Sequence, residues 1–153
     1  VLRACETKAE VVAEDEKETG RRALLNFGHT FGHAFEAEYG YGDDLLHGEA
    51  VAVGMVVATD LSVRLGLCPP EDARRTRAHM EKLGLPVDLP KLAQPHWNAD
   101  KLLGHMMSDK KVEAKRPTFI LTRGIGKAFT TQDVEAQLLH EFLGETLRPE
   151  SAK

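Results

Sequence analysis

The sequence lacks a long apolar run, has only two cysteines and carries no excess of positive charge. Its longest apolar runs are too short to span a bilayer, and the chain does not open as a signal peptide does, with a basic segment followed by an apolar one. Cys5 and Cys68 do not have metal-ligand spacing, so they are interpreted as free thiols in a reducing cytosol. The net charge of −4 and the pI near 6.0 argue against general binding to nucleic acid or to a membrane surface. We therefore expect a cytoplasmic protein with neither of these partners.

The spacing of apolar residues is mostly helical, and no internal repeat is present. Helices are predicted at residues 2–14, 22–38, 48–65 and 71–83. A further helix is predicted from the N-cap Asn98 to about Ser108, and a last one from residue 131 or 132 to about 147. Prolines predict a loop at residues 85–95, and residues 118–121 and 127–130 flank a glycine-containing turn typical of a β-hairpin. The fold class predicted is mainly α, a multihelical domain with one small β-hairpin.

The chain opens at Val1 and reads within a few residues like the middle of a helix. We expect a fragment, a processed chain or an excised domain. A functional site in it can therefore depend on residues outside these 153.

Three histidines form the most informative pattern. His29 and His33 are four residues apart and share one face of a predicted helix, and each follows a glycine. Glycine is costly inside a helix, so the pair suggests that a backbone, a ligand or an ion comes close. His47 follows a glycine-rich loop at the start of the next helix. Three converging imidazoles would suit a catalytic zinc ion, with Glu18, Glu36 and Glu49 available as carboxylate ligands, as partners of the ligands or as bases.

Two histidines at this spacing also occur by chance on solvated helix faces. The glycines, the nearby Asn26 and Arg22 and the third histidine favour a site. The HExxH pattern of metalloproteases is absent, because Thr30 follows His29. Grouped around a metal, the basic residues would suit an anionic substrate carrying phosphate or carboxylate; they are Lys8, Arg21, Arg22, Lys110 and Lys111.

Residues 8–36, which include Asn26-Phe-Gly-His29-Thr-Phe-Gly-His33, strongly resemble 3-dehydroquinate synthase. The similarity continues through Leu46-His-Gly-Glu49 to Met55, and it resumes at Asp109-Lys-Lys111 and at Ile125-Gly-Lys127. The resemblance implies that residues 1–153 are the family's C-terminal, mostly helical domain, and that the N-terminal NAD-binding domain is absent from the chain.

The members of that family are lyases of the shikimate pathway. The resemblance implies conversion of 3-deoxy-D-arabino-heptulosonate 7-phosphate to 3-dehydroquinate, with release of phosphate and transient reduction of a bound NAD. It also implies zinc, or another divalent metal such as cobalt, and a homodimeric full-length protein. The isolated chain is expected to be inactive.

The resemblance also implies individual roles. His29 and His47 match metal ligands, and the third family ligand is a glutamate of a motif that lies before Val1; Glu10 is not assigned to it. Glu18 and His33 match acid–base positions. Substrate-binding positions are matched by Lys8, Arg22, Asn26 and one of Lys110 and Lys111.

Two other functions stay open at this point. A related sugar-phosphate cyclase would share the metal ligands and act on a different phosphorylated sugar. A non-catalytic helical domain that binds a metal or a partner is the other alternative.

Overall fold

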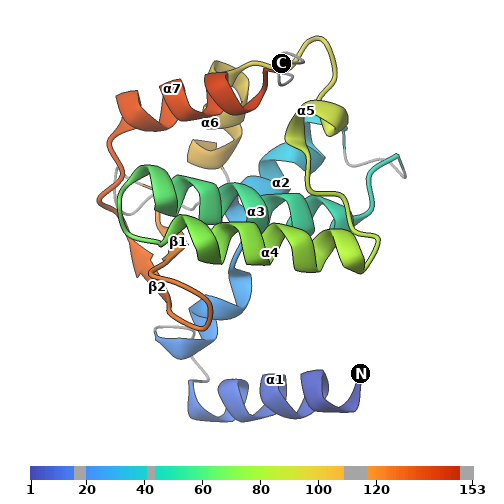
Figure 1. Cartoon of the computed structure of the whole chain (residues 1–153), viewed down its shortest axis with the longest axis vertical. Helices are drawn as coiled ribbons and strands as arrows, with labels where there is room; N and C mark the ends of the chain where they lie inside the picture. Colours follow the sequence, from blue (N-terminus) through green and yellow to red (C-terminus); the bar gives the residue numbers. More distant parts are fainter. Residues whose placement is uncertain (16–19, 41–43, 109–116, 149–153) are drawn as a thin grey trace.

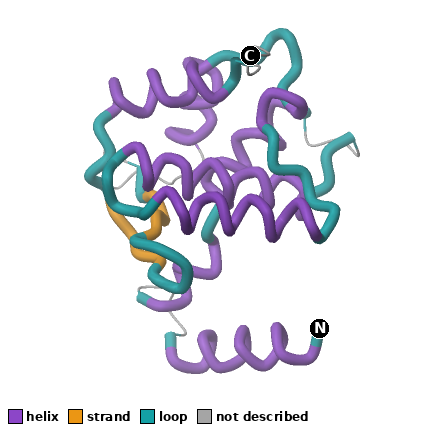
Figure 2. Tube along the Cα trace, in the orientation of Figure 1, coloured by secondary structure: helices purple, strands orange, loops and turns teal. Residues whose placement is uncertain are grey.

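The computed structural model describes residues 1–15, 20–40, 44–108 and 117–148, and these form a helical body with one small hairpin (Figures 1 and 2). The elements are α1 (Leu2–Glu14), the 3₁₀ helix η1 (Arg21–Asn26), α2 (His29–Glu38), α3 (His47–Arg64), α4 (Pro70–Lys82), α5 (Leu89–Leu92), α6 (Ala99–Ser108), β1 (Phe119–Thr122), β2 (Ala128–Thr131) and α7 (Ala136–Thr146). The predicted fold class is confirmed.

Helix α3 lies at the centre of the body, with α2, α4 and β1 against it. It is buried along most of its length because its residues are apolar or small nearly all round. The largest buried side chains around it are Phe31 and Phe35 of α2, Leu61 of α3 and Phe119 of β1. No helix in the described part of the chain is long and apolar enough to cross a lipid bilayer.

Glycines bring α2 and α3 unusually close together. A Cβ atom on Gly54 would collide with the carbonyl oxygen of Gly28 and lie 2.9 Å from the amide nitrogen of Gly32. A Cβ on Gly32 would lie 3.2 Å from the backbone of Ala50. The glycines before the two histidines therefore serve the approach of a neighbouring backbone, one of the three causes considered from the sequence.

The hairpin is antiparallel and packs against α3. Phe119 pairs with Thr131, and Thr122 pairs with Ala128. The hydroxyl of buried Ser62 accepts a hydrogen bond of 3.1 Å from the amide of Thr122, which ties the sheet to the central helix.

Three of the predicted elements were wrong in part. The single helix at residues 22–38 is two pieces, because Gly28 has a φ of 87° and interrupts the helix between η1 and α2. The last helix starts at Ala136 and not at 131 or 132, because β2 continues to Thr131. The predicted loop at 85–95 contains the short helix α5. The other helices and both strands agree with prediction to within a residue or two, and Asn98 caps α6 by accepting a 2.9 Å hydrogen bond from the amide of Lys101.

Candidate metal and anion site

The three histidines converge where α2 meets the start of α3. The ring centroids of His29 and His33 are 5.4 Å apart, those of His29 and His47 5.3 Å, and those of His33 and His47 5.9 Å. The first two are neighbours on one helix face, and the close α2–α3 crossing brings the third beside them. The expected convergence of the three imidazoles is observed.

His29 is the member whose ring is most affected by burial. Its Nδ1 is buried, with no hydrogen-bond partner among the described residues. Burial lowers the pKa of His29 below its ordinary value; the backbone of Phe27 and of Asn26 opposes this shift, and the neighbouring His33 and His47 add to it. The neutral form, which is the form that binds metals, is therefore favoured.

Glu36 adds a carboxylate to the cluster. It lies one turn beyond His33 on α2, and its Oε1 is 3.0 Å from Nδ1 of His47. The Glu36 side chain is 16% exposed, whereas that of His47 is 57% exposed. One ligand atom from each of His33, Glu36 and His47 can be chosen so that all three lie within 4.8 Å of one another.

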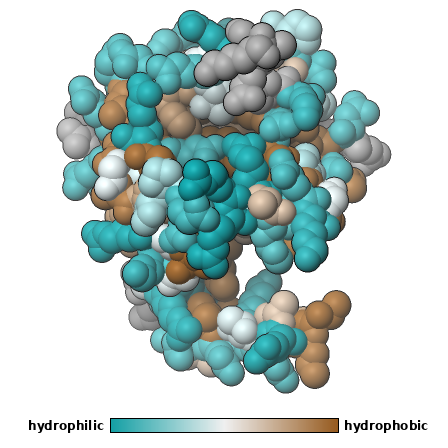
Figure 3. Space-filling model, viewed as in Figure 1, coloured by the Kyte–Doolittle hydropathy of each residue, from teal (hydrophilic) through white to brown (hydrophobic). Residues whose placement is uncertain are grey.

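A groove of about 800 Å³ opens beside the cluster, between α1 and the body. It contains four of the residues singled out from the sequence: Lys8, Arg22, Asn26 and His29. Figure 3 shows the hollow between α1 and the rest of the molecule on one face. With Arg3 of α1, three cations, an amide and an imidazole thus line one open surface, which suits a polar anion.

The donors present fit a divalent metal ion. Imidazole nitrogen and carboxylate oxygen are zinc ligands, and His33, Glu36 and His47 supply both kinds of atom within 4.8 Å of one another. The ligand atoms that converge are those of His33, Glu36 and His47, and the predicted ligand His29 lies beside this group without belonging to it. The structure brings together both predicted ligands and the predicted acid–base histidine.

The structure separates the three available glutamates. Glu49 caps α3, since its Oε2 accepts a hydrogen bond of 3.1 Å from the amide of Leu46, so its carboxylate is engaged locally. Glu36 faces His47. Glu18, predicted as an acid–base residue, lies outside the described residues, as do Lys110 and Lys111.

Sequence reasoning missed the groove contributions of Arg3, Thr7, Val12 and Leu25. Arg3 and Thr7 lie one turn apart on α1, and Thr7 lies next to Lys8. A helical projection from Lys8 would have found Ala4 and Val12, which also line the groove, because residues four apart share a face.

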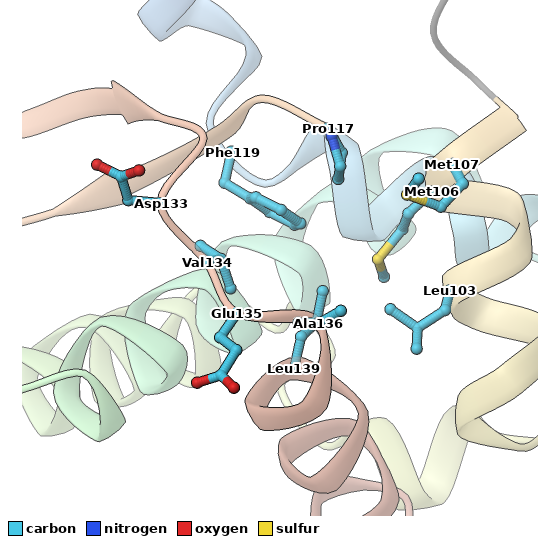
Figure 4. A pocket seen from close by; sticks show the side chains of 10 residues that line it. All are labelled: Leu103, Met106, Met107, Pro117, Phe119, Asp133, Val134, Glu135, Ala136 and Leu139. Carbon is cyan, nitrogen blue, oxygen red and sulfur yellow. The ribbon is translucent and has the colours of Figure 1, made fainter. Parts of the chain in front are cut away.

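A second hollow, of about 480 Å³, contains none of the predicted site residues. It lies between α6, the hairpin and α7, and Figure 4 shows its mostly apolar side chains. Its lining includes Leu103, Met106, Phe119, Val134 and Leu139. It is an apolar recess with carboxylates only at Asp133 and Glu135.

A family model described as "3-dehydroquinate synthase C-terminal" matches residues 1–112. The chain belongs to this family. The resemblance seen in the sequence is therefore confirmed.

Relatives in the 3-dehydroquinate synthase family are similar over most of the chain. The 3-dehydroquinate synthase of Rhodospirillum rubrum is 62% identical over 136 residues, which are 88% of this chain and 35% of the relative. That of Caulobacter vibrioides is 54% identical over 145 residues, which are 95% of this chain and 39% of the relative. The chain thus spans little more than a third of these relatives' length.

Solved structures with the same fold are sugar-phosphate cyclases. The 2-epi-5-epi-valiolone synthase ValA of Streptomyces hygroscopicus, solved with NAD⁺ and Zn²⁺ bound, has a TM-score of 0.75 and 28% identity, covering 94% of this chain and 38% of its own. A 2-deoxy-scyllo-inosose synthase complexed with carbaglucose-6-phosphate, NAD⁺ and Co²⁺ has a TM-score of 0.72 and 26% identity, covering 92% of this chain and 38% of its own.

Proposed function

We propose that this chain is the metal- and substrate-binding domain of a 3-dehydroquinate synthase. The whole enzyme would convert 3-deoxy-D-arabino-heptulosonate 7-phosphate to 3-dehydroquinate and phosphate, as a cytoplasmic homodimer. Residues 1–153 would form the C-terminal domain, and an N-terminal domain would supply the NAD site and the remaining metal ligand.

One observation carries the proposal. Lys8, Arg22, Asn26 and His29 line the same groove, although they come from three elements. Each matches a functional position of the family, and a chance set of polar surface residues would not be expected to meet in one cleft beside three imidazoles.

The proposed roles follow from the chemistry of each side chain. Lys8 and Arg22 bind the anionic groups of the substrate, and Asn26 orients a hydroxyl or carbonyl by hydrogen bonding. His29 and His47 hold the divalent metal, and His33 transfers a proton at a ring nitrogen, because an imidazole that coordinates a metal cannot also shuttle protons. When bound, the metal supplies Lewis-acid polarisation of substrate oxygens. Glu18 and one of Lys110 and Lys111 remain predicted acid–base and substrate-binding residues.

The test is turnover by the full-length parent protein. We expect NAD-dependent release of phosphate from the heptulosonate phosphate, and loss of that release when zinc is removed by a chelator. Absence of NAD-dependent phosphate release from a folded, metal-loaded parent would overturn the proposal.

A related sugar-phosphate cyclase is the second candidate. It is favoured by the fold similarity to a synthase solved with carbaglucose-6-phosphate. A panel of heptose and hexose phosphates offered to the same full-length protein discriminates the two, since preferred turnover of a hexose phosphate would support this alternative.

The isolated 153-residue chain should bind zinc weakly and have no synthase activity, because the proposed NAD site and one ligand lie outside it. It would then act only as a metal-binding helical domain. Calorimetric titration with zinc and a phosphate-release assay check both expectations. Tight, site-specific zinc binding or measurable turnover by the chain alone would contradict them.

A further inference from the structure

Glu36 and His47 form a contact that none of the proposed roles uses. The carboxylate lies on α2, in series with His29 and His33, which are seven and three residues before it. Helical residues with these separations share one face, so the two imidazoles and the carboxylate all face the start of α3, where His47 is the first residue.

The geometry of the contact determines which atom must carry the proton. An ionised carboxylate only accepts hydrogen bonds. With Glu36 Oε1 at 3.0 Å from Nδ1 of His47, the nitrogen that donates is Nδ1. The neutral ring then has its lone pair on Nε2, and Nε2 is the nitrogen that remains able to bind a cation.

The surroundings favour a lasting contact. The Glu36 side chain is only 16% exposed, while the His47 side chain is 57% exposed. A buried carboxylate gains more from a charged or polar partner than an exposed one does, because less water competes for it. The glycines also allow a close backbone approach between α2, which carries Glu36, and α3, which begins at His47.

We propose that Glu36 is a positioning residue for His47. It holds the ring in the Nδ1–H tautomer and in a single orientation, so that Nε2 is the metal-binding atom. The competing role is that Glu36 is itself a metal ligand together with His33 and His47, because their ligand atoms can lie within 4.8 Å of one another. The positioning role rests on the proposed function only in taking His47 as a ligand.

The chain offers matched variants. Glu36→Ala removes the acceptor, whereas Glu36→Gln removes the charge and keeps an oxygen that can accept from Nδ1–H. Glu49→Gln is the control, since Glu49 is also a carboxylate near the start of α3 but bonds to the Leu46 amide. Circular dichroism establishes that each variant is folded.

The first measurement is the tautomer of His47 in the metal-free chain, read from ¹⁵N chemical shifts and long-range ¹H–¹⁵N couplings at about pH 9, where neutral imidazoles predominate. We expect the Nδ1–H tautomer in the wild-type chain, in Glu36→Gln and in Glu49→Gln, and a shift towards Nε2–H in Glu36→Ala. An Nε2–H tautomer in the wild-type chain, or no change in Glu36→Ala, overturns the proposal.

The second measurement is zinc affinity by calorimetry. A residue that orients a ligand typically changes metal affinity about 10–100-fold, so Glu36→Ala should weaken binding by that range and Glu36→Gln by less. If Glu36→Gln weakens binding as much as Glu36→Ala while keeping the tautomer, Glu36 is a direct ligand and the proposal fails. If the tautomers behave as expected but wild-type zinc binding is not detected, the positioning of His47 stands and the weak zinc binding proposed for the isolated chain fails.

Discussion

At the level of single residues, His29 combines a buried ring nitrogen with two neighbouring imidazoles. Burial first, and these neighbours to a lesser extent, lower its folded-state pKa. Between that value and the unfolded value of about 6.5, the unfolded chain binds more protons than the folded one, so stability rises with pH through this window and falls on acidification. Urea unfolding of the metal-free chain should show this loss below about pH 6.5.

His29→Gln removes the titrating ring, so it should reduce the loss of stability between neutral and acidic pH. His140→Gln is the matched control, because His140 lies away from the cluster and contacts Asp100 on α6. An unchanged pH dependence in His29→Gln would contradict the assignment.

Asp60 and Arg77 form a partly buried ion pair, in which burial and the neighbouring charge shift the pKa of Asp60 in opposite directions. Burial raises the pKa of Asp60, although Arg77 at 2.8 Å opposes the shift. The folded form therefore binds more protons above the unfolded pKa, and the contribution of Asp60 to stability falls as pH rises through that window. Asp60→Asn removes this penalty together with the pair, so at neutral pH it should change the free energy of unfolding by less than about 1 kcal/mol.

Arg77→Met provides the comparison for that variant. Arg77 also donates to the carbonyl of Val87 at 2.9 Å and lies 3.2 Å from Asp88. Its loss removes a donor from Asp60 and from the carbonyl of Val87, while Asp88 keeps its ion pair with Lys91, and should cost about 1–3 kcal/mol in urea unfolding. A cost for Asp60→Asn as large as that for Arg77→Met would contradict the expected cancellation of burial against pairing at Asp60.

The candidate site could be predicted from the sequence in its local contacts and in the meeting of its three histidines, but not in its other contacts between elements. The shared face of His29 and His33 follows from helical spacing, whereas the bond from the Leu46 amide to Glu49 does not, because Leu46 stands where the capping pattern has Ser or Thr. The pairing of Glu36 with His47 does not follow in the same way. It depends on how α2 crosses α3, and this geometry is set by packing between segments separated by a loop.

At the level of elements, the α2–α3 crossing depends on the absence of a side chain at Gly54. A methyl group there would meet backbone atoms of Gly28 and Gly32, which cannot rotate away as a side chain can. Gly54→Ala should therefore lower the free energy of unfolding by at least about 2 kcal/mol and shift the NMR signals of all three site imidazoles.

Gly144→Ala is the matched control, because Gly144 is inside α7 and an added Cβ would meet nothing within 4 Å. It should be neutral or stabilise the chain by up to about 1 kcal/mol, as alanine favours helices over glycine. If both substitutions have the same effect, the crossing is less tight than described.

Most helices and both strands could be predicted from the sequence. The main error, at residues 22–38, has a physical cause. Residues 22–38 contain good helix formers, so their pattern gave one helix. The break at Gly28 arises from its left-handed conformation and from the nearby backbone of Met55, neither of which leaves a periodic signal in the sequence. Tertiary packing, and not local propensity, decides that boundary.

At the level of the whole molecule, α1 stands apart from the body (Figure 1). Within α1, all of which is described, only Val11 is buried, and the helix packs mainly against η1. It nevertheless forms one wall of the groove and contributes Lys8 to it. This helix therefore contributes little to the core but supplies two of the three cations of the groove, Arg3 and Lys8, beside Arg22 of η1.

Deleting residues 1–14 should thus separate anion binding from stability. The body would lose the stabilisation from burying about one valine side chain, roughly 1.5–3 kcal/mol, and should still unfold cooperatively in a thermal melt.

Affinity for inorganic phosphate should fall about tenfold or more, because a charge-assisted hydrogen bond contributes about 1.5–3 kcal/mol. Lys8→Met in the full chain should reproduce part of that loss, since Arg3 of α1 also lines the groove, whereas Lys91→Met, at an exposed lysine paired with Asp88, should not weaken binding. If phosphate titration followed by NMR gives equal affinities for the intact and deleted chains, α1 is not a wall of the anion site. In that case the groove described here is only the space between two parts of the chain.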